Sequence, residues 1–145
     1  MLREDKRSYY LGIAESVLKR STCLRRKYGA VIVKDDEIIS TGYNGAPRGR
    51  KNCDELGICL REKIPHGERF ELCRSVHAEA NAIISAARKD MLGGTLYLSG
   101  QEADGSRVIN AMPCLMCKRL IINAGITKLI TRDQEITTDT WIDEE

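Results

Sequence analysis

Apolar residues follow a helical period at the start of the chain and a strand period directly after it. The first apolar positions repeat every three or four residues, which predicts an amphipathic helix over residues 5–20 with Asp5 as its cap. A run rich in β-branched residues then predicts a strand over residues 28–33. A pair of aspartates marks a turn, and residues 37–43 are predicted to return as the second strand of a hairpin.

Helical and strand patterns alternate in the second half of the chain. Pro113 suits the first turn of a helix, and Gly125 suits its end. The expected elements, in chain order, are a helix over residues 76–89 ended by a glycine pair, a buried strand over 95–98, a helix over 113–124 and a strand over 128–131. This order favours an α/β fold in which helices cover the faces of a sheet.

Residues 44–75 separate these two halves and show no sustained period. We expect one long functional loop region here, because a structureless stretch of this length is uncommon in a compact domain. Basic side chains gather just before and within it: Arg25, Arg26, Lys27, Arg48, Arg50 and Lys51. They suit an anionic ligand, and the ordinary alternative is a charged face in contact with solvent.

Length and composition fit one domain over residues 1–145. The net charge of +2 argues against a nucleic-acid partner, and no apolar run is long enough for a membrane span. The charged N-terminus lacks the apolar core of a secretory signal, so we expect a cytoplasmic location in which the six cysteines stay reduced. Cysteines in that setting indicate metal binding or catalysis rather than disulfides.

His77, Cys114 and Cys117 have the spacing of ligands to a catalytic zinc ion. Zinc prefers four nitrogen and sulfur ligands, and a catalytic site keeps one of the four positions for water. The two cysteines are expected near the start of one helix, where the helix dipole favours thiolates. The combination H-x-E followed by P-C-x-x-C is the signature of zinc-dependent nucleobase deaminases.

Glu79 lies two residues beyond His77 on the same predicted helix. Its carboxylate is expected to stand over the metal without binding it, and to move a proton from water to a ring nitrogen and to the leaving amine. Attack at the carbon that bears an exocyclic amine would then release ammonia. Each of these residue types is common at surfaces or in redox sites when it occurs singly, but together they favour the catalytic interpretation.

Two further segments give the sequence its resemblance to a known family. They are Gly-Ala-Val-Ile-Val at residues 29–33 and Gly-Tyr-Asn-Gly-Ala-Pro-Arg-Gly at residues 42–49. With Val-His-Ala-Glu-Ala-Asn-Ala-Ile at residues 76–83, they resemble the cytidine and deoxycytidylate deaminase superfamily, most of all its deoxycytidylate (dCMP) branch. The resemblance implies a three-layer α/β/α fold around a mixed sheet of about five strands. It also implies a zinc-dependent hydrolase that converts dCMP to dUMP and ammonia for thymidylate synthesis.

The resemblance also implies contacts with a nucleotide. In this family the Asn of Gly-Tyr-Asn-Gly touches the sugar, and the basic link lies near the phosphate. Asn44 and Arg26 are therefore candidate contacts, and Ala78 inside the zinc motif is a third. The glycines around Asn44 are consistent with a binding site, because they let the backbone approach a ligand. Taken alone, such a segment is more often a turn. The family further implies a homo-oligomer, often a hexamer, and in some members activation by dCTP and inhibition by dTTP.

Four cysteines lie outside the catalytic motif: Cys23, Cys53, Cys59 and Cys73. Some members of the dCMP branch carry a second, structural zinc bound by the link before the first strand and by the long loop. These four residues fall in those segments, and His66 is a competing ligand. A closed tetrahedral ion would order a polar loop that has little core of its own, whereas the alternative is a set of ordinary thiols.

The sequence departs from the family pattern at two places. Tyr28 stands where the family usually has a smaller apolar residue. Residues 99–112 contain an apparent insertion, where most relatives have only a few residues that help to shape the base pocket. It is predicted to form a polar hairpin or lid, and a tolerated surface loop is the alternative.

Other functions stay open at this point. The same chemistry would serve another cytosine or guanine nucleoside or base, or a tRNA adenosine, although the tRNA substrate calls for a more basic surface. A non-catalytic, zinc-stabilised interaction module is a further alternative. Glu79 argues against that module, because a purely structural site has no need of it and fills the fourth zinc position.

Overall fold

The computed structural model describes residues 2–65, 69 and 72–144. In this part of the chain, five strands form one mixed sheet in the order β2-β1-β3-β4-β5. The strands are β1 (Arg26–Lys34), β2 (Glu37–Tyr43), β3 (Thr95–Glu102), β4 (Lys128–Ile130) and β5 (Glu135–Thr137). β3 and β4 pair in parallel, and the other neighbouring strands are antiparallel.

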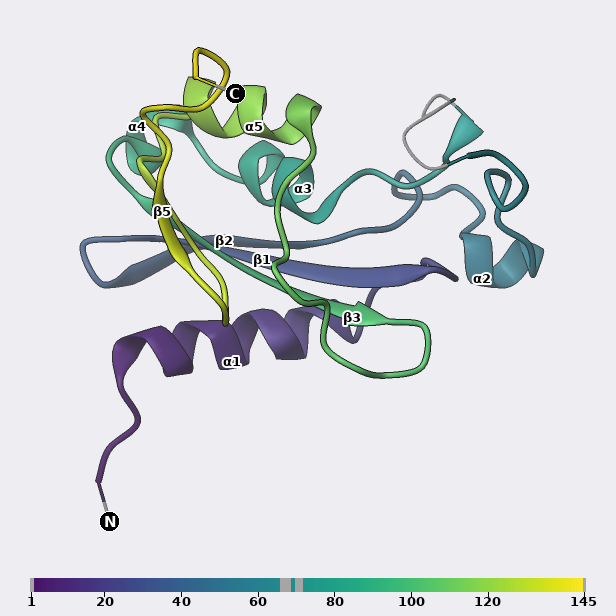
Figure 1. Ribbon diagram of the computed structural model, residues 1–145, viewed down its shortest axis with the longest axis horizontal. Helices are drawn as coiled ribbons and strands as arrows, with labels where there is room; N and C mark the ends of the chain where they lie inside the picture. Colours follow the sequence, from purple (N-terminus) through teal and green to yellow (C-terminus); the bar gives the residue numbers. More distant parts are fainter. Residues whose placement is uncertain (1, 66–68, 70–71, 145) are drawn as a thin grey trace.

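Helices cover both faces of this sheet (Figure 1). One face carries α1 (Lys6–Leu18), and the other carries α3 (Ala78–Ile84), α4 (Arg88–Met91) and α5 (Leu115–Asn123). The short helix α2 (Cys53–Leu56) lies beyond one end of the sheet, within the long loop. The three-layer α/β/α arrangement around a mixed sheet is therefore confirmed.

Each face of the sheet has its own apolar core. On the α1 side, Val31 and Val33 of β1 pack with Leu11 and Tyr97. The alternate residue Ile32 points to the opposite face, where the core includes Leu96 and Leu98 of β3, Ala78 and Ala82 of α3, and Ile121 of α5. Successive strand residues point to opposite faces, so β1 buries side chains in both cores.

Two glycines bring helices close to the sheet. Gly29 of β1 lies under α1, where an added Cβ would overlap backbone atoms of Ala14 and Leu18. Gly42 of β2 lies under α3 on the other face, where a Cβ would overlap backbone atoms of Ala78 and Ala82. The glycine at position 42 thus sets how near the first turn of α3 lies to the sheet.

The elements predicted for the first half of the chain are present. Asp5 caps α1, and its side chain accepts a hydrogen bond from the Ser8 N–H at 2.7 Å. The hairpin between β1 and β2 turns at Asp35 and Asp36, whose φ angles of 51° and 60° fit the favoured two-residue turn. Within the long loop, helix α2 was not predicted.

The second half differs from the prediction at three places. The helix expected over residues 76–89 is two helices, α3 and α4, because the chain leaves α3 at Ser85 and turns to bury Met91 in the core. Pro113 lies outside α5, before its cap residue Cys114, rather than in its first turn. β3 extends to Glu102, beyond the predicted end at residue 98, and β5 was not predicted.

No helix in the described ranges is both long enough and apolar enough to cross a membrane.

Candidate active site

His77 and the two cysteines of the P-C-x-x-C motif meet where two helices begin. His77 is the cap residue of α3, Cys114 is the cap residue of α5, and Cys117 lies in the first turn of α5. The Nδ1 atom of His77 is 3.5 Å from the Sγ atom of Cys114 and 3.4 Å from that of Cys117. The parallel β3–α5–β4 crossover and α3 thus place three predicted ligands around one point.

This geometry fits a zinc ion. Zn–N and Zn–S bonds of about 2.0 and 2.3 Å at a tetrahedral angle place their ligand atoms about 3.5 Å apart, which matches both distances. Among residues 2–65, 69 and 72–144, this is the only group of three His, Cys, Asp or Glu residues whose ligand atoms all lie within 4.8 Å. The residues present therefore suit zinc, with three ligands from the protein.

The protonation of the three ligands also favours metal binding. The pKa of Cys114 is lowered to about 3, chiefly because Cys117 hydrogen-bonds to its sulfur, and His77 adds to this. The same hydrogen bond raises the pKa of Cys117, so this thiol holds its proton more tightly than Cys114 does. The hydrogen bond with Cys114 raises the pKa of His77, while burial acts in the opposite direction. A thiolate is thus ready for a metal at neutral pH.

Glu79 lies in the first turn of α3, two residues beyond His77. Only 5% of its surface is exposed. Burial raises the pKa of its carboxyl, although a backbone N–H and the neighbouring His77 act to lower it. A carboxyl group with a raised pKa can both accept and donate a proton near neutral pH, as a general acid and base must.

Asn44, the expected sugar contact, uses its side chain within the protein. Its Oδ1 atom accepts hydrogen bonds from the Ser21 hydroxyl at 2.6 Å and from the Tyr28 N–H at 2.8 Å. Its Nδ2 atom donates to the Arg26 carbonyl at 2.9 Å. Asn44 therefore joins the link before β1 to the end of β2, and its contact with a nucleotide stays a prediction.

Arg26, the expected phosphate contact, is paired with an acidic side chain. Its Nε and Nη2 atoms donate to the two carboxylate oxygens of Glu102, at 2.6 and 3.2 Å. Glu102 ends β3 directly opposite Arg26 on β1. The pair is exposed, so a phosphate would have to share the guanidinium with Glu102. Ala78, the third expected contact, is fully buried as the first residue of α3.

Arg61 is a charged residue near the site that the sequence analysis did not single out. It lies in the long loop, yet only 8% of its surface is exposed, and its charge acts to lower the pKa of His77. A cation at this position would attract an anionic substrate. Arg61 belongs to no sequence motif, so the sequence gives no signal for it. Only its burial in the folded chain singles it out.

The apparent insertion at residues 99–112 begins as a continuation of β3. The chain turns after Glu102 and returns beside β3, where Arg107 bridges to Gln101. Asp133, which follows β4, accepts hydrogen bonds from Arg107 Nη1 at 2.8 Å and from the Asn110 N–H at 2.7 Å. The predicted hairpin is therefore present, anchored at both ends of its returning segment.

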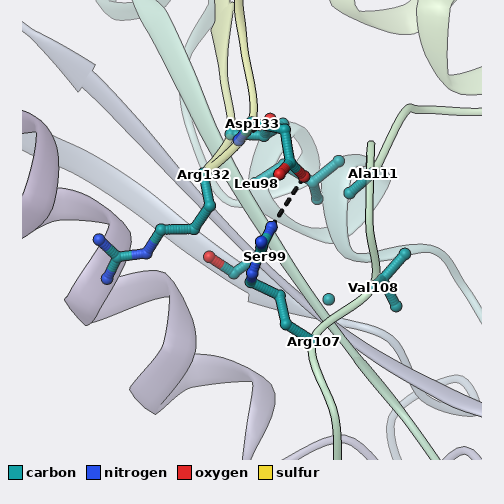
Figure 2. A pocket seen from close by; sticks show the side chains of 9 residues that line it. Leu98, Ser99, Arg107, Val108, Ala111, Arg132 and Asp133 are labelled. Carbon is teal, nitrogen blue, oxygen red and sulfur yellow. Dashed lines mark hydrogen bonds and ion pairs between the residues drawn. The ribbon is translucent and has the colours of Figure 1, made fainter.

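A hollow lies under this returning segment, and Figure 2 shows Arg107 and Asp133 beside it. Its volume of about 10 Å³ is sufficient for one water molecule and far too small for a nucleotide. The hollow packs the insertion against β3 and the segment after β4, and it is not a substrate site.

The other four cysteines lie near one another at the end of the molecule that carries α2. Cys53 begins α2 and is buried, and all six cysteines of the chain are free thiols. Burial raises the pKa of Cys53, and the nearby Cys23, Cys73 and Cys59 add to the rise. No three of these sulfur atoms lie within 4.8 Å of one another, although all four residues are described. His66, the competing ligand, lies outside the described residues.

Comparison with known families agrees with this geometry. The family described as the cytidine and deoxycytidylate deaminase zinc-binding region matches residues 4–132. The chain belongs to this deaminase family. Both helix N-termini that carry the candidate zinc ligands lie inside the matched range.

Two curated members of the deaminase family illustrate the similarity. A deoxycytidylate deaminase of Mycobacterium phage D29 is 38% identical over 134 residues, which cover 90% of this chain and 96% of the relative. The deoxycytidylate deaminase of Saccharomyces cerevisiae is 34% identical over 132 residues. These residues cover 90% of this chain but only 38% of the yeast protein. The chain thus spans nearly the whole phage relative but less than two fifths of the yeast one.

Solved structures of deaminases share the fold. The dCMP deaminase of cyanophage S-TIM5 in complex with dCMP and dUMP has a TM-score of 0.65 at 26% identity. That match covers 92% of this chain and 85% of the phage enzyme. A cytidine deaminase from Burkholderia pseudomallei has a TM-score of 0.59 at 14% identity, which shows the fold alone. The cytidine deaminase-like fold expected from the sequence is therefore confirmed.

Proposed function

We propose that this protein is a zinc-dependent hydrolase that converts dCMP and water to dUMP and ammonia, and so supplies dUMP for thymidylate synthesis. The observation that carries the proposal is the placement of the buried Glu79 beside His77, Cys114 and Cys117. The similarity to the D29 deoxycytidylate deaminase, which extends over nearly the whole of both chains, supports dCMP as the substrate. The proposal treats residues 1–145 as one deaminase domain.

The protein residues have distinct roles in this reaction. His77, Cys114 and Cys117 would hold a zinc ion, which when bound lowers the pKa of a coordinated water to about 7 and so supplies a nucleophile. Glu79 would take one proton from that water and deliver it to the ring nitrogen of cytosine. It would then pass the second proton of the same water to the amine, as the C–N bond breaks and the C=O bond of uracil forms. Its burial limits the access of bulk water and raises the pKa of its carboxyl, which favours its acting as an acid as well as a base.

The proposed nucleotide contacts come from the sheet end and the loops. Asn44 would contact the sugar through the second hydrogen of its Nδ2 atom, and Ala78 would border the base. Arg26 and the buried Arg61 would attract the phosphate. Their positive charges offer charge-assisted hydrogen bonds, which contribute more to binding than neutral ones.

A panel of ammonia-release assays tests the substrate. The panel is dCMP, CMP, deoxycytidine, cytosine, guanine and a tRNA anticodon stem. We expect dCMP to react best, with kcat/KM for deoxycytidine lower by about 100-fold, because the nucleoside lacks the charged hydrogen bonds to the phosphate. A preference for deoxycytidine would contradict the phosphate contacts. Release from guanine or tRNA without release from dCMP would overturn the proposed substrate.

The proposal includes a second, structural zinc ion bound by Cys23, Cys53, Cys59 and Cys73. Their common location and the raised pKa of Cys53 support a set of neighbouring thiols. Metal binding would draw the four sulfur atoms together and order the loop around α2. In that case the catalytic zinc and the structural zinc would be two separate ions in each chain.

Metal analysis of the purified protein tests this second site. We expect two zinc ions per chain, falling to one in a Cys53→Ala, Cys59→Ala double variant, because that variant keeps all three catalytic ligands. A Cys117→Ala variant serves as the matched control, since it should lose the other ion. One zinc ion in the unmodified protein would remove the structural site.

We also propose that the protein is a homo-oligomer and that it is located in the cytoplasm. A homo-oligomer is supported by large apolar side chains that are exposed on α3 and α5, including Ile84 at 70% and Leu115 at 55%. A cytoplasmic location is supported by the free thiols, which must be reduced in order to bind metal. A hexamer and regulation by dCTP and dTTP stay predictions from the family.

A further inference from the structure

Tyr28 is the middle residue of a row that crosses the sheet at the end that carries the zinc ligands. On one side its partner in β3 is Gly100. On the other side Asn44, just after β2, accepts a hydrogen bond from the Tyr28 N–H at 2.8 Å and donates its own N–H to the Tyr28 carbonyl at 3.4 Å. The cross-strand row is therefore Asn44, Tyr28 and Gly100.

This row borders the site of the proposed chemistry. The next row inward contains Ala30, paired with Gly42, and it lies directly beneath Ala78 at the start of α3. Because side chains two residues apart share a face, Tyr28 lies on the α3 face of the sheet. Gly45 and Val76 exchange backbone hydrogen bonds at 3.2 and 2.7 Å, so the segment that ends at His77 runs beside this row.

The charge of Glu79 also acts on Tyr28. Burial is the chief cause of the raised pKa of Tyr28, and the negative charge of Glu79 adds to the rise. The ring is half-buried and packs against the core that includes Ala78. One part of the ring is therefore fixed by the core, and the rest is accessible to a ligand.

A glycine of β3, at the start of the insertion, makes room for this ring. A Cβ at Gly100 would lie 2.7 and 2.9 Å from two carbon atoms of the Tyr28 ring, so only glycine lets the ring lie across β3. The Tyr28 hydroxyl accepts a hydrogen bond from Arg26 Nη1 at 3.4 Å, and Glu102 holds Arg26 from the extended part of β3. The two departures from the family pattern, Tyr28 and the insertion, are thus in contact.

We propose that Tyr28 is a specificity-determining residue whose ring forms the floor of the substrate pocket beside the deoxyribose. This inference rests on the proposed dCMP deaminase function and extends it to the sugar. The apolar ring face offers no hydrogen-bond partner, so a ribose 2′-hydroxyl buried against it would lose its hydrogen bonds to water without replacement. A deoxyribose carbon loses nothing there, which favours dCMP over CMP.

Steady-state kinetics on a set of variants test whether the Tyr28 ring forms the floor of the substrate pocket. With Tyr28→Val, the residue becomes small and apolar as in the family pattern, and we expect KM for dCMP to rise about tenfold and the preference for dCMP over CMP to fall about tenfold. Tyr28→Phe keeps the ring, so both values should stay close to those of the unmodified enzyme. In each variant kcat and zinc content should change little, because no metal ligand or proton donor is altered.

A double-mutant cycle of Tyr28 and Gly100 distinguishes the loss of the Tyr28 ring contact from a general disturbance of the structure. Gly100→Ala should displace the ring and raise KM about as much as Tyr28→Val does, but should add little when Val already stands at position 28. Tyr43→Val is the matched control, because Tyr43 pairs with Gly29 and faces α1 on the opposite side of the sheet. It should leave KM unchanged.

Ammonia release from dCMP by the unmodified enzyme distinguishes the role of Tyr28 from the proposed function. If the unmodified enzyme releases ammonia from dCMP but Tyr28→Val leaves both KM and the dCMP preference unchanged, the floor is overturned. Equal effects of Gly100→Ala in both backgrounds would also overturn it. If the unmodified enzyme does not deaminate dCMP at all, the proposed function is wrong, and the floor beside its deoxyribose is overturned with it.

Discussion

Replacing Glu79 by glutamine is expected to lower kcat for dCMP deamination by about 10²–10⁴-fold. The amide has nearly the same shape as the carboxyl but can neither accept the proton of water nor deliver it to the ring nitrogen and the amine. Since only 5% of Glu79 is exposed, bulk water has little access to replace it. Steady-state kinetics with ammonia detection measure the loss, and zinc content is determined on the same preparation.

The neighbouring residues make this a test of proton transfer rather than of metal binding. His77, Cys114 and Cys117 are unchanged in the variant, so we expect it to retain its catalytic zinc. Glu55→Gln in α2 is a suitable control, because it replaces an exposed glutamate in the first turn of another helix. Deamination by Glu79→Gln at the unmodified rate would show that another group moves the proton.

Replacing Gly42 by alanine is expected to lower the free energy of unfolding by about 3 kcal/mol. The added Cβ would overlap backbone atoms of Ala78 and Ala82, and backbone cannot move aside as a flexible side chain can. Helix α3 then has to shift away from β2 and carry His77 with it, so zinc affinity should fall as well. Urea unfolding and zinc titration measure the two effects.

Gly12→Ala is the control, and it should change the free energy of unfolding in the opposite direction. Gly12 lies inside α1, and nothing occupies the space within 4 Å of an added Cβ. Alanine is the better helix former, so this variant should gain about 1 kcal/mol of stability. Equal stability of Gly42→Ala and the unmodified protein would mean that α3 does not pack against β2 as closely as described.

The candidate catalytic residues could be singled out from the sequence because their motifs are local. His77 and Glu79 lie two residues apart, and Cys114 and Cys117 lie three apart, so the relative position within each pair follows from one helical turn. Asp5 as the cap of α1 was predictable for the same reason, since its partner is the nearby Ser8. The sheet brings the His77–Glu79 pair and the Cys114–Cys117 pair together in space. That placement was expected only from the family resemblance.

Features that depend on distant packing were not predictable in this way. The break between α3 and α4 follows from the burial of Met91 in a core built from both halves of the chain. Asn44 looks like a turn residue in sequence, yet its partners are Ser21, in the link before β1, and Arg26, the first residue of β1. Arg61 has no periodic or motif context, so its burial beside the site is visible only in the folded chain.

The pairing of β1 with β3 has a consequence for how the protein acquires its metal. These adjacent strands are far apart in sequence, and closing such a long chain segment is slow in folding. Because β3 leads into α5, we expect Cys114 and Cys117 to meet His77 late in folding. Until then the newly made chain presents two thiols without their imidazole partner. Zinc supplied during synthesis would therefore be captured by the nearly folded chain, and a shortage of zinc would leave the partly buried thiol of Cys114 open to oxidation.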